Sequence, residues 1–185
     1  GRAMCPLDCI VNGGWVQRSG DIQAVGGHSV AAHRAGCRVL DRLCRILSPG
    51  RAGIRGVSQG GAPKDLNLYQ TQKALDNAKH AVKDGGIVIL AGSCKEGLGE
   101  AVFEEWMLGS PSPQAMIERI GRDFQLGGHK AAAIALVLER AQIFLVSELE
   151  PDFVRRIFLT PYPTIQQAFD VALAEKGEDA SVLIM

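Results

Sequence analysis

Residues 54–93 carry the pattern that most constrains the fold, because a short apolar segment, a glycine-containing turn, an amphipathic helix and a long apolar segment follow one another. The first segment, residues 54–57, is of strand length and leads into Gly60 and Gly61, which permit a tight turn. The last segment, residues 86–93 (G-I-V-I-L-A-G-S), is almost entirely apolar, as is typical of a strand buried on both faces. A strand, a helix and a strand in this order form a βαβ unit. The pattern therefore predicts an α/β fold with a mostly parallel sheet.

The helix of this unit is expected from about Asn67 to Asp84. Asp65 or Asn67 is the expected N-cap, and the glycines at 85 and 86 are expected to end the helix. Apolar and small side chains recur at spacings of three and four, which places them on one face against a core: Leu68, Thr71, Leu75, Ala78 and Val82. The remaining surface then carries polar side chains: Tyr69, Gln70, Lys73, Asp76, Asn77 and His80.

The rest of the chain adds a hairpin, further helices and two more strands. A short antiparallel β-hairpin is expected within residues 8–25 and a helix over residues 29–46. After the βαβ unit the expected elements are helices at 100–108, 112–122, 129–140 and 164–176, a short helix or turn at 151–157, and strands at 143–147 and 181–185. The last strand ends without a following loop, so we expect the chain to be truncated there. Together these elements predict a layered α/β sandwich preceded by a hairpin and a helix.

Composition excludes several kinds of partner. The 20 Lys and Arg residues balance the 20 Asp and Glu residues, so no net charge favours nucleic acid or an anionic membrane, and we expect neither partner. The longest apolar stretch, residues 131–146, is interrupted by charged residues and is too short to span a bilayer core of roughly 30 Å. Five cysteines, an odd number without a tight pair, favour a reducing, cytoplasmic location, and no metal site is expected from them.

The run from Gly60 to Ala78 resembles the C-terminal domain of the nickel-dependent lactate racemase family. It matches the family pattern G-G-x-P-K-D-x-N-L-Y-Q-x-Q-K-A-L-D-N-A. The segments C-I-V-N (residues 9–12), A-H-R-A-G-C (32–37) and G-G-H-K-A (127–131) extend the resemblance over nearly the whole chain. The resemblance implies that residues 1–50 are an inter-domain segment or the end of the N-terminal domain, and that residues 51–185 are the C-terminal α/β domain.

What the family does is implied by the resemblance alone. Its members racemise or epimerise 2-hydroxy acids by reversible hydride transfer to a nickel-pincer nucleotide, which the N-terminal domain holds together with the acid-base groups. The resemblance implies that this domain is not part of the present sequence. We therefore expect this chain to be the substrate-binding or lid domain of such an isomerase, with the N-terminal catalytic domain of the same protein and a small 2-hydroxy acid as its partners. On its own the chain is expected to be inactive, with no catalytic residue and no metal ligand.

The resemblance implies that Tyr69, Gln70 and Lys73 contact the substrate. Their spacing makes chemical sense, because Tyr69 and Lys73 lie one helical turn apart with Gln70 beside them. A phenol, an amide and an ammonium can then converge on one carboxylate and its neighbouring oxygen. We expect Lys73 to bind the carboxylate and Gln70 to orient it.

His129 is the remaining candidate, as a residue that sets substrate specificity. The glycines at 127 and 128 would let the backbone approach a ligand, and Lys130 adds a second charge. By contrast, Lys64 and Asp65 are interpreted as residues that hold the turn by local hydrogen bonds.

Two other functions stay open. A non-enzymatic α/β ligand- or partner-binding domain would use the helix for packing alone. A nucleotide-binding domain with Gly60 and Gly61 as an anion cradle is the weaker hypothesis, because neither G-x-G-x-x-G nor G-x4-G-K-[ST] occurs.

Overall fold

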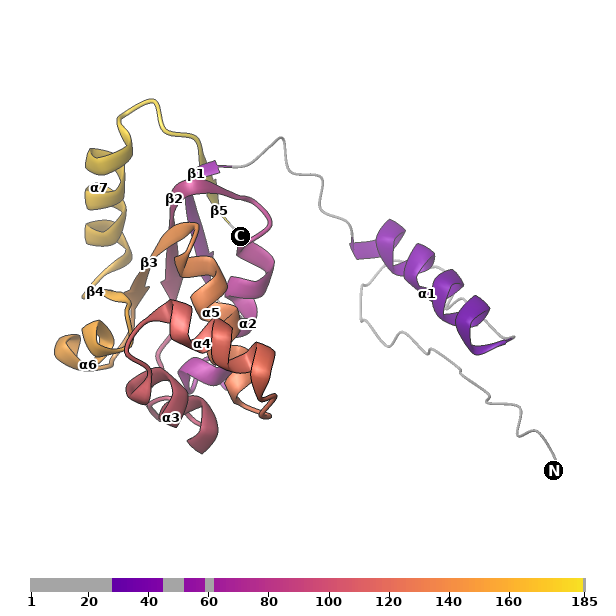
Figure 1. Cartoon of the computed structure of the whole chain (residues 1–185). Helices are drawn as coiled ribbons and strands as arrows, with labels where there is room; N and C mark the ends of the chain where they lie inside the picture. Colours follow the sequence, from indigo (N-terminus) through magenta and orange to yellow (C-terminus); the bar gives the residue numbers. More distant parts are fainter. Residues whose placement is uncertain (1–27, 45–51, 59–61, 185) are drawn as a thin grey trace. The chain divides into compact units, whose positions relative to one another are not determined.

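The computed structural model describes residues 28–44, 52–58 and 62–184 (Figure 1). The chain divides into two units, Gly1–Ser48 and Pro49–Met185, which are described separately. In the first unit the described residues form helix α1 (Ser29–Cys44), which agrees with the helix expected over residues 29–46. The hairpin expected within residues 8–25 lies outside the described residues.

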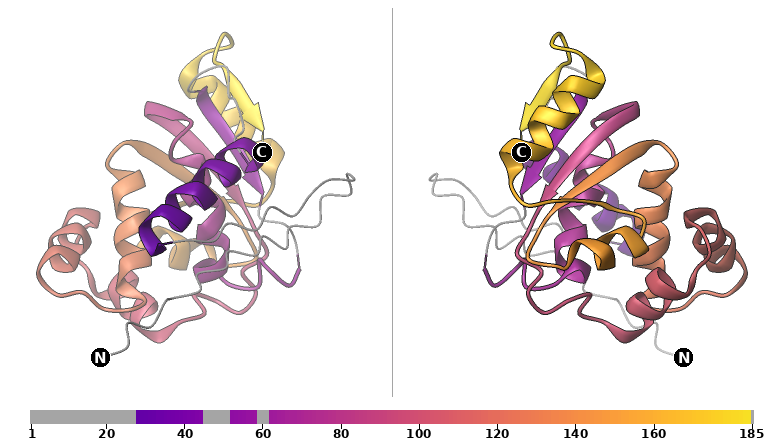
Figure 2. Two further views of the ribbon diagram at one scale, coloured as in Figure 1. Left: turned by 90° about the vertical axis from the view of Figure 1, so that its right-hand side faces the viewer. Right: turned by 90° about the vertical axis from the view of Figure 1, so that its left-hand side faces the viewer.

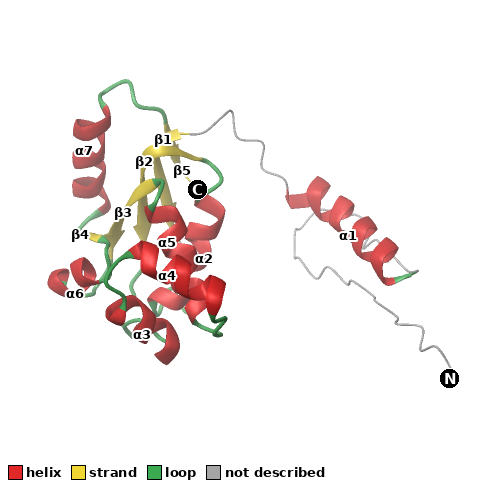
Figure 3. Cartoon of the chain, in the orientation of Figure 1, coloured by secondary structure: helices red, strands yellow, loops and turns green. Residues whose placement is uncertain are grey.

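The second unit is built on a five-stranded sheet in the order β4-β3-β2-β1-β5 (Figure 3). Every strand pair in it is parallel. This confirms the α/β fold with a mostly parallel sheet. The short edge strand β4 was not expected from the sequence, since it contains Pro161. The strands are β1 (Ala52–Ser58), β2 (Val82–Ala91), β3 (Ala141–Val146), β4 (Thr160–Tyr162) and β5 (Val182–Ile184).

Helices cover both faces of the sheet, which makes the unit a three-layer sandwich. Helix α7 packs on one face, while α2 and α5 cover the other with α3, α4 and α6 beside them (Figures 1 and 2). The central strand β2 contributes side chains to the apolar cores on both faces of the sheet, because successive side chains of a strand point to opposite faces. Val88 and Leu90 pack in the core under α2 and α5, and Ile87 and Ile89 pack in the core under α7. The helices are α2 (Leu68–Ala78), α3 (Ala101–Gly109), α4 (Pro113–Arg122), α5 (Gly128–Leu138), α6 (Pro151–Arg156) and α7 (Ile165–Lys176).

Helix α2 begins as expected but ends six residues earlier than the sequence suggests. Asn67 is its N-cap, and its Oδ1 accepts a 3.0 Å hydrogen bond from the Gln70 N–H. The helix stops at Ala78 rather than Asp84. Val82 is buried as predicted, but as the first residue of β2, where it pairs with Ala52. A buried apolar residue fits a helix or a strand equally well. The helical spacing therefore included Val82, which belongs to the next element, β2.

Helix α2 contributes Leu75 to the main core, where only 1% of its surface is exposed. We predict that Leu75→Ala lowers the free energy of unfolding by about 2–5 kcal/mol, because it removes buried apolar contacts and leaves a cavity. Asn77→Ala, on the exposed face of the same helix, is the matched control. Urea unfolding measures both, and a loss below about 1 kcal/mol for Leu75→Ala would contradict the packing of α2.

Cys94 follows β2 and is fully buried, with its Sγ 3.5 Å from the Thr71 Oγ1. Burial raises the pKa of this thiol above its ordinary value of 9.0. The hydrogen bond between Cys94 and Thr71 lowers the pKa, and the charges of Asp65 and Glu148 add to the rise. The folded state therefore resists thiolate formation more strongly than the unfolded state does.

This difference predicts a stability loss in alkali. Well below pH 9 the thiol is protonated in both the folded and the unfolded state. Above pH 9 the thiol of the unfolded chain loses its proton first, because its pKa is the lower of the two. The free energy of unfolding therefore falls as the pH rises toward the folded-state pKa. The slope from Cys94 is at most about 1.4 kcal/mol per pH unit. Unfolding of wild type and Cys94→Ala between pH 8 and pH 10 (roughly one unit either side of the thiol's ordinary pKa) measures it, with Cys37→Ala on α1 as the control. Equal slopes for wild type and Cys94→Ala would rule out this account.

Candidate functional site

The start of α2 is held at the carboxyl ends of the parallel strands, where open α/β sheets bind ligands. The turn at residues 65–69 runs beside the loop at residues 94–98, which follows β2. Four backbone hydrogen bonds of 2.8–3.1 Å join them: Cys94 N to Asp65 O, Glu96 N to Leu66 O, Leu68 N to Gly97 O and Tyr69 N to Leu98 O. Asp65 also accepts a 3.2 Å hydrogen bond from the Ser93 N–H through its Oδ2. The first turn of α2 therefore has a fixed place at this edge.

Gln70 and Lys73 form a polar pair on the outward face of the first two turns of α2. The Lys73 Nζ donates a 2.8 Å hydrogen bond to the Gln70 Oε1. Lys73 is exposed and Gln70 is half-buried. A lysine ammonium has three donors, so Lys73 retains donors for an anion while it contacts Gln70. The helical spacing predicted from the sequence thus brings these two side chains into direct contact.

Tyr69 is half-buried, and α3 and α5 hold it from two sides. Its ring packs edge-on against Phe103 of α3, with a centroid separation of 5.6 Å. From α5, the Lys130 Nζ lies 3.9 Å from the centroid of the Tyr69 ring and donates a 2.6 Å hydrogen bond to the Tyr69 carbonyl oxygen. Lys130 is thus a residue of α5 that contacts the predicted site. We call Tyr69, Gln70, Lys73 and Lys130 the α2–α5 cluster.

The α2–α5 cluster concentrates positive charge. Partial burial lowers the pKa of Lys130, the charge of Lys73 lowers it further, and Asp76 acts in the opposite direction. Asp76 in turn forms a 2.9 Å ion pair with Lys79. Two ammonium groups therefore lie close enough to influence each other, an arrangement that a bound anion would stabilise.

His129 lies beside this cluster in sequence, but its contacts are local. Its Nδ1 accepts a 3.1 Å hydrogen bond from the Gly127 N–H, and its ring stacks on Phe124 with a centroid separation of 6.1 Å. With Nδ1 as acceptor, a neutral ring carries its proton on Nε2, which can donate outward. Within the described part of the chain, none of these contacts joins His129 to α2.

The glycines before His129 serve packing, which differs from the ligand approach expected from the sequence. A Cβ on Gly127 would collide with the carboxylate of Glu100, and a Cβ on Gly128 would lie 2.5 Å from the Trp106 ring. Gly127 also has a φ of +97°, which L side chains rarely adopt. The two glycines thus let the start of α5 pack closely against α3.

Gln72 is a buried polar residue that the periodicity did not single out. It is 0% exposed, and neither atom of its amide has a hydrogen-bond partner among the described residues. Residues 69, 72 and 76 share one face of α2, so Gln72 lies one turn beyond Tyr69. An unsatisfied buried amide costs about 1–3 kcal/mol.

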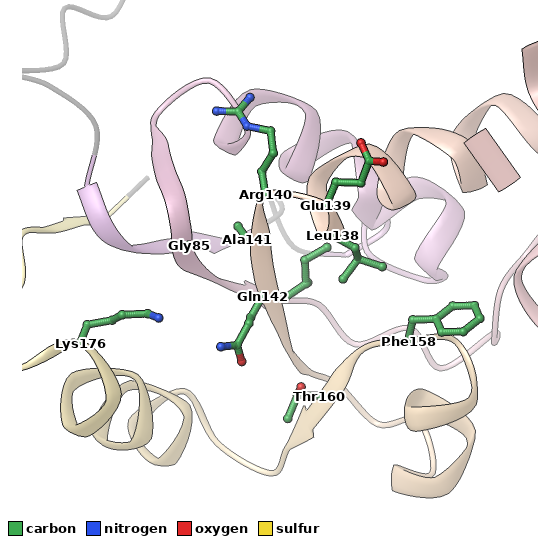
Figure 4. Close-up of a pocket in the computed structure, with 10 residues that line it drawn as sticks. Gly85, Leu138, Glu139, Arg140, Ala141, Gln142, Phe158, Thr160 and Lys176 are labelled. Carbon is green, nitrogen blue, oxygen red and sulfur yellow. The ribbon is translucent and has the colours of Figure 1, made fainter. Parts of the chain in front are cut away.

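A cavity of about 430 Å³ lies at the opposite edge of the sheet, beside the amino ends of β2, β3 and β4 (Figure 4). It is lined by Gly85, Arg140, Gln142, Thr160 and Lys176, among others. Its two cations already form ion pairs: Arg140 with Asp84 at 2.8 Å and Lys176 with Glu175 at 2.7 Å. This cavity therefore offers less attraction to an anion than the α2–α5 cluster does.

Two further features were sought in the described ranges, residues 28–44, 52–58 and 62–184. They contain no group of three or more His, Cys, Asp or Glu side chains placed to hold a metal ion. Nor do they contain a helix with the length and apolarity needed to cross a membrane.

Two curated lactate racemases are similar to this chain. The lactate racemase of Thermoanaerobacterium thermosaccharolyticum is 30% identical over 169 residues, which is 89% of this chain and 39% of the relative. The lactate racemase of Lactiplantibacillus plantarum is 25% identical over 169 residues, which is 89% of this chain and 40% of the relative. The chain thus spans about 40% of the length of the relatives it matches.

Solved structures and a family model agree with these similarities. The lactate racemase apoprotein from T. thermosaccharolyticum matches with a TM-score of 0.78 and 27% identity, over 89% of this chain and 40% of that one. A protein of Thermotoga maritima matches in fold, with a TM-score of 0.54 and 12% identity, over 84% of this chain and 40% of that one. The family model "Lactate racemase C-terminal domain" covers residues 48–185. The resemblance inferred from residues 60–78 is thereby confirmed, and the chain belongs to the lactate racemase family through its C-terminal domain.

Proposed function

We propose that this chain is the substrate-binding and lid domain of a 2-hydroxy-acid racemase or epimerase. The observation that carries the proposal is the contact between Gln70 and Lys73 on the first two turns of α2. This pair lies at the carboxyl edge of a parallel sheet, in a chain whose curated relatives are lactate racemases. The substrate class is a small 2-hydroxy acid.

Each residue of the site has a proposed task. Lys73 binds the substrate carboxylate by a charge-assisted hydrogen bond, worth about 1.5–3 kcal/mol. Gln70 orients the same carboxylate through its amide. The phenol of Tyr69, whose ring is held by Phe103 and Lys130, contacts the neighbouring hydroxyl or keto oxygen.

We propose His129 as the residue that contacts the substrate side chain. Its Nε2–H is left free to donate because Nδ1 is engaged by the Gly127 N–H. The exposed ring of Phe124, against which His129 stacks, adds an apolar surface next to this donor. A substrate side chain at this place meets one hydrogen-bond donor and one aromatic ring.

The cofactor and the chemistry belong to the rest of the protein in this proposal. The nickel-pincer nucleotide implied by the resemblance supplies hydride transfer, and we propose that the N-terminal catalytic domain holds it. The role of this chain is to bind and orient the substrate, residues 1–50 are the inter-domain segment, and the chain alone is inactive.

Steady-state kinetics of the full-length, cofactor-loaded protein with lactate tests the role of Lys73. We expect Lys73→Ala to lower kcat/KM by about 10- to 150-fold, the equivalent of losing one charge-assisted hydrogen bond. Lys176→Ala is the matched control, since it removes a lysine side chain at the other edge of the sheet, where Lys176 pairs with Glu175. The control is expected to behave as wild type.

Unchanged turnover and unchanged KM in Lys73→Ala would contradict the assignment. That outcome, together with a stability loss in Leu75→Ala, would favour the alternative of a non-enzymatic α/β ligand- or partner-binding domain that uses α2 for packing alone.

A further inference from the structure

Lys130 makes two separate contacts with a single residue of the proposed site. Its Nζ donates a 2.6 Å hydrogen bond to the Tyr69 carbonyl oxygen and lies 3.9 Å from the centroid of the same residue's ring. The hydrogen bond fixes the backbone of the first turn of α2, and the cation–π contact fixes the ring. The main chain and the side chain of Tyr69 are therefore both held by one ammonium group.

Lys130 can hold Tyr69 because its own backbone is firmly placed. It is the third residue of α5, and its N–H donates a 3.0 Å hydrogen bond to the Gly127 carbonyl oxygen. The start of α5 is pressed against α3, since a single added carbon on Gly128 would lie 2.5 Å from the Trp106 ring. Lys130 thus links the start of α5, which packs closely against α3, to Tyr69 of the site.

The charge of Lys130 is the second part of the argument. Lys73 and Lys130 repel each other, and partial burial adds to the cost of keeping Lys130 protonated. Of the groups that act on it, Asp76 is the anion, and that carboxylate is shared with Lys79 at 2.9 Å. A carboxylate bound at Lys73 would offset this repulsion, so both lysines would contribute to its affinity.

We propose that Lys130 is a positioning residue of the substrate site, which holds Tyr69 in place and adds to Lys73 a second positive charge that attracts an anionic substrate. This inference rests on the proposed function. It assigns a role to a residue that lies on another helix than the sequence motif at residues 60–78.

Three substitutions separate the contact from the charge. Lys130→Met keeps the length of the side chain but removes both the donor and the charge. Lys130→Gln keeps a donor for the Tyr69 carbonyl without the charge, and Lys130→Arg keeps the charge. Lys176→Met is the control, because it removes a lysine that pairs with Glu175 at the other edge of the sheet.

The measurement is calorimetric titration of the intact protein, prepared without cofactor, with L-lactate at low and at high ionic strength. We expect Lys130→Met to bind lactate about tenfold more weakly than wild type at low ionic strength. Its affinity should also depend less on salt, because one of the two attracting charges is gone. Lys130→Gln should show the same loss of salt dependence, whereas Lys130→Arg and Lys176→Met should keep it. A purely structural role of Lys130 would not alter the salt dependence.

The outcomes separate this inference from the function on which it rests. If Lys73→Ala loses lactate binding while all Lys130 variants bind as wild type, with wild-type salt dependence, the role of Lys130 is refuted and the proposed function stands. If Lys73→Ala also binds as wild type, both are refuted. Should Lys130→Met fail to fold, the comparison of Lys130→Gln with Lys130→Arg gives the same decision, since equal salt dependence in that pair overturns the inference.

Discussion

The backbone pairing between residues 65–69 and residues 94–98 determines where α2 begins, and the candidate site depends on that position. Its four hydrogen bonds tie the turn before α2 to the loop after β2. A shift of one residue in this pairing would rotate α2 by about 100° and turn part of its buried face toward solvent. Leu68 and Leu75 would then leave the core. The burial of these two side chains therefore favours the observed register. The outward direction of Gln70 and Lys73 follows from the burial of their neighbours.

The charges at the two edges of the sheet are arranged differently, and this contrast favours one edge as an anion site. At the amino edge, Arg140 and Lys176 are paired with Asp84 and Glu175. At the carboxyl edge, Lys73 contacts the neutral amide of Gln70, and Lys130 contacts a carbonyl oxygen and a ring. The cavity of about 430 Å³ lies at the first edge and the candidate site at the second. Shape and electrostatics therefore point to different places on this domain, and recognition of a small carboxylate depends more on electrostatics.

Local signals in the sequence predicted most of the fold. Asn67, one of the two expected N-caps of α2, accepts a backbone hydrogen bond from the first turn, because capping depends on residues within one turn. Ser112 and Thr164, the first residues of two helices expected from the sequence, accept the same kind of hydrogen bond. The predicted end of α2 was wrong by six residues. Val82 is buried because it pairs with Ala52 in the sheet, and the local sequence does not reveal this contact between distant parts of the chain. Lys130 was noticed only as a charge beside His129, because its contact with Tyr69 joins residues 61 positions apart. The substrate roles of Tyr69, Gln70, Lys73 and His129 stay predictions.

The most direct test of this account is a crystal structure of the full-length protein with a 2-hydroxy acid bound. The account predicts a carboxylate oxygen within hydrogen-bond distance of the Lys73 Nζ, with the Gln70 amide beside it and Lys130 still on the Tyr69 ring. A substrate carboxylate bound away from α2, for example between Arg140 and Lys176 at the amino edge of the sheet, would contradict it.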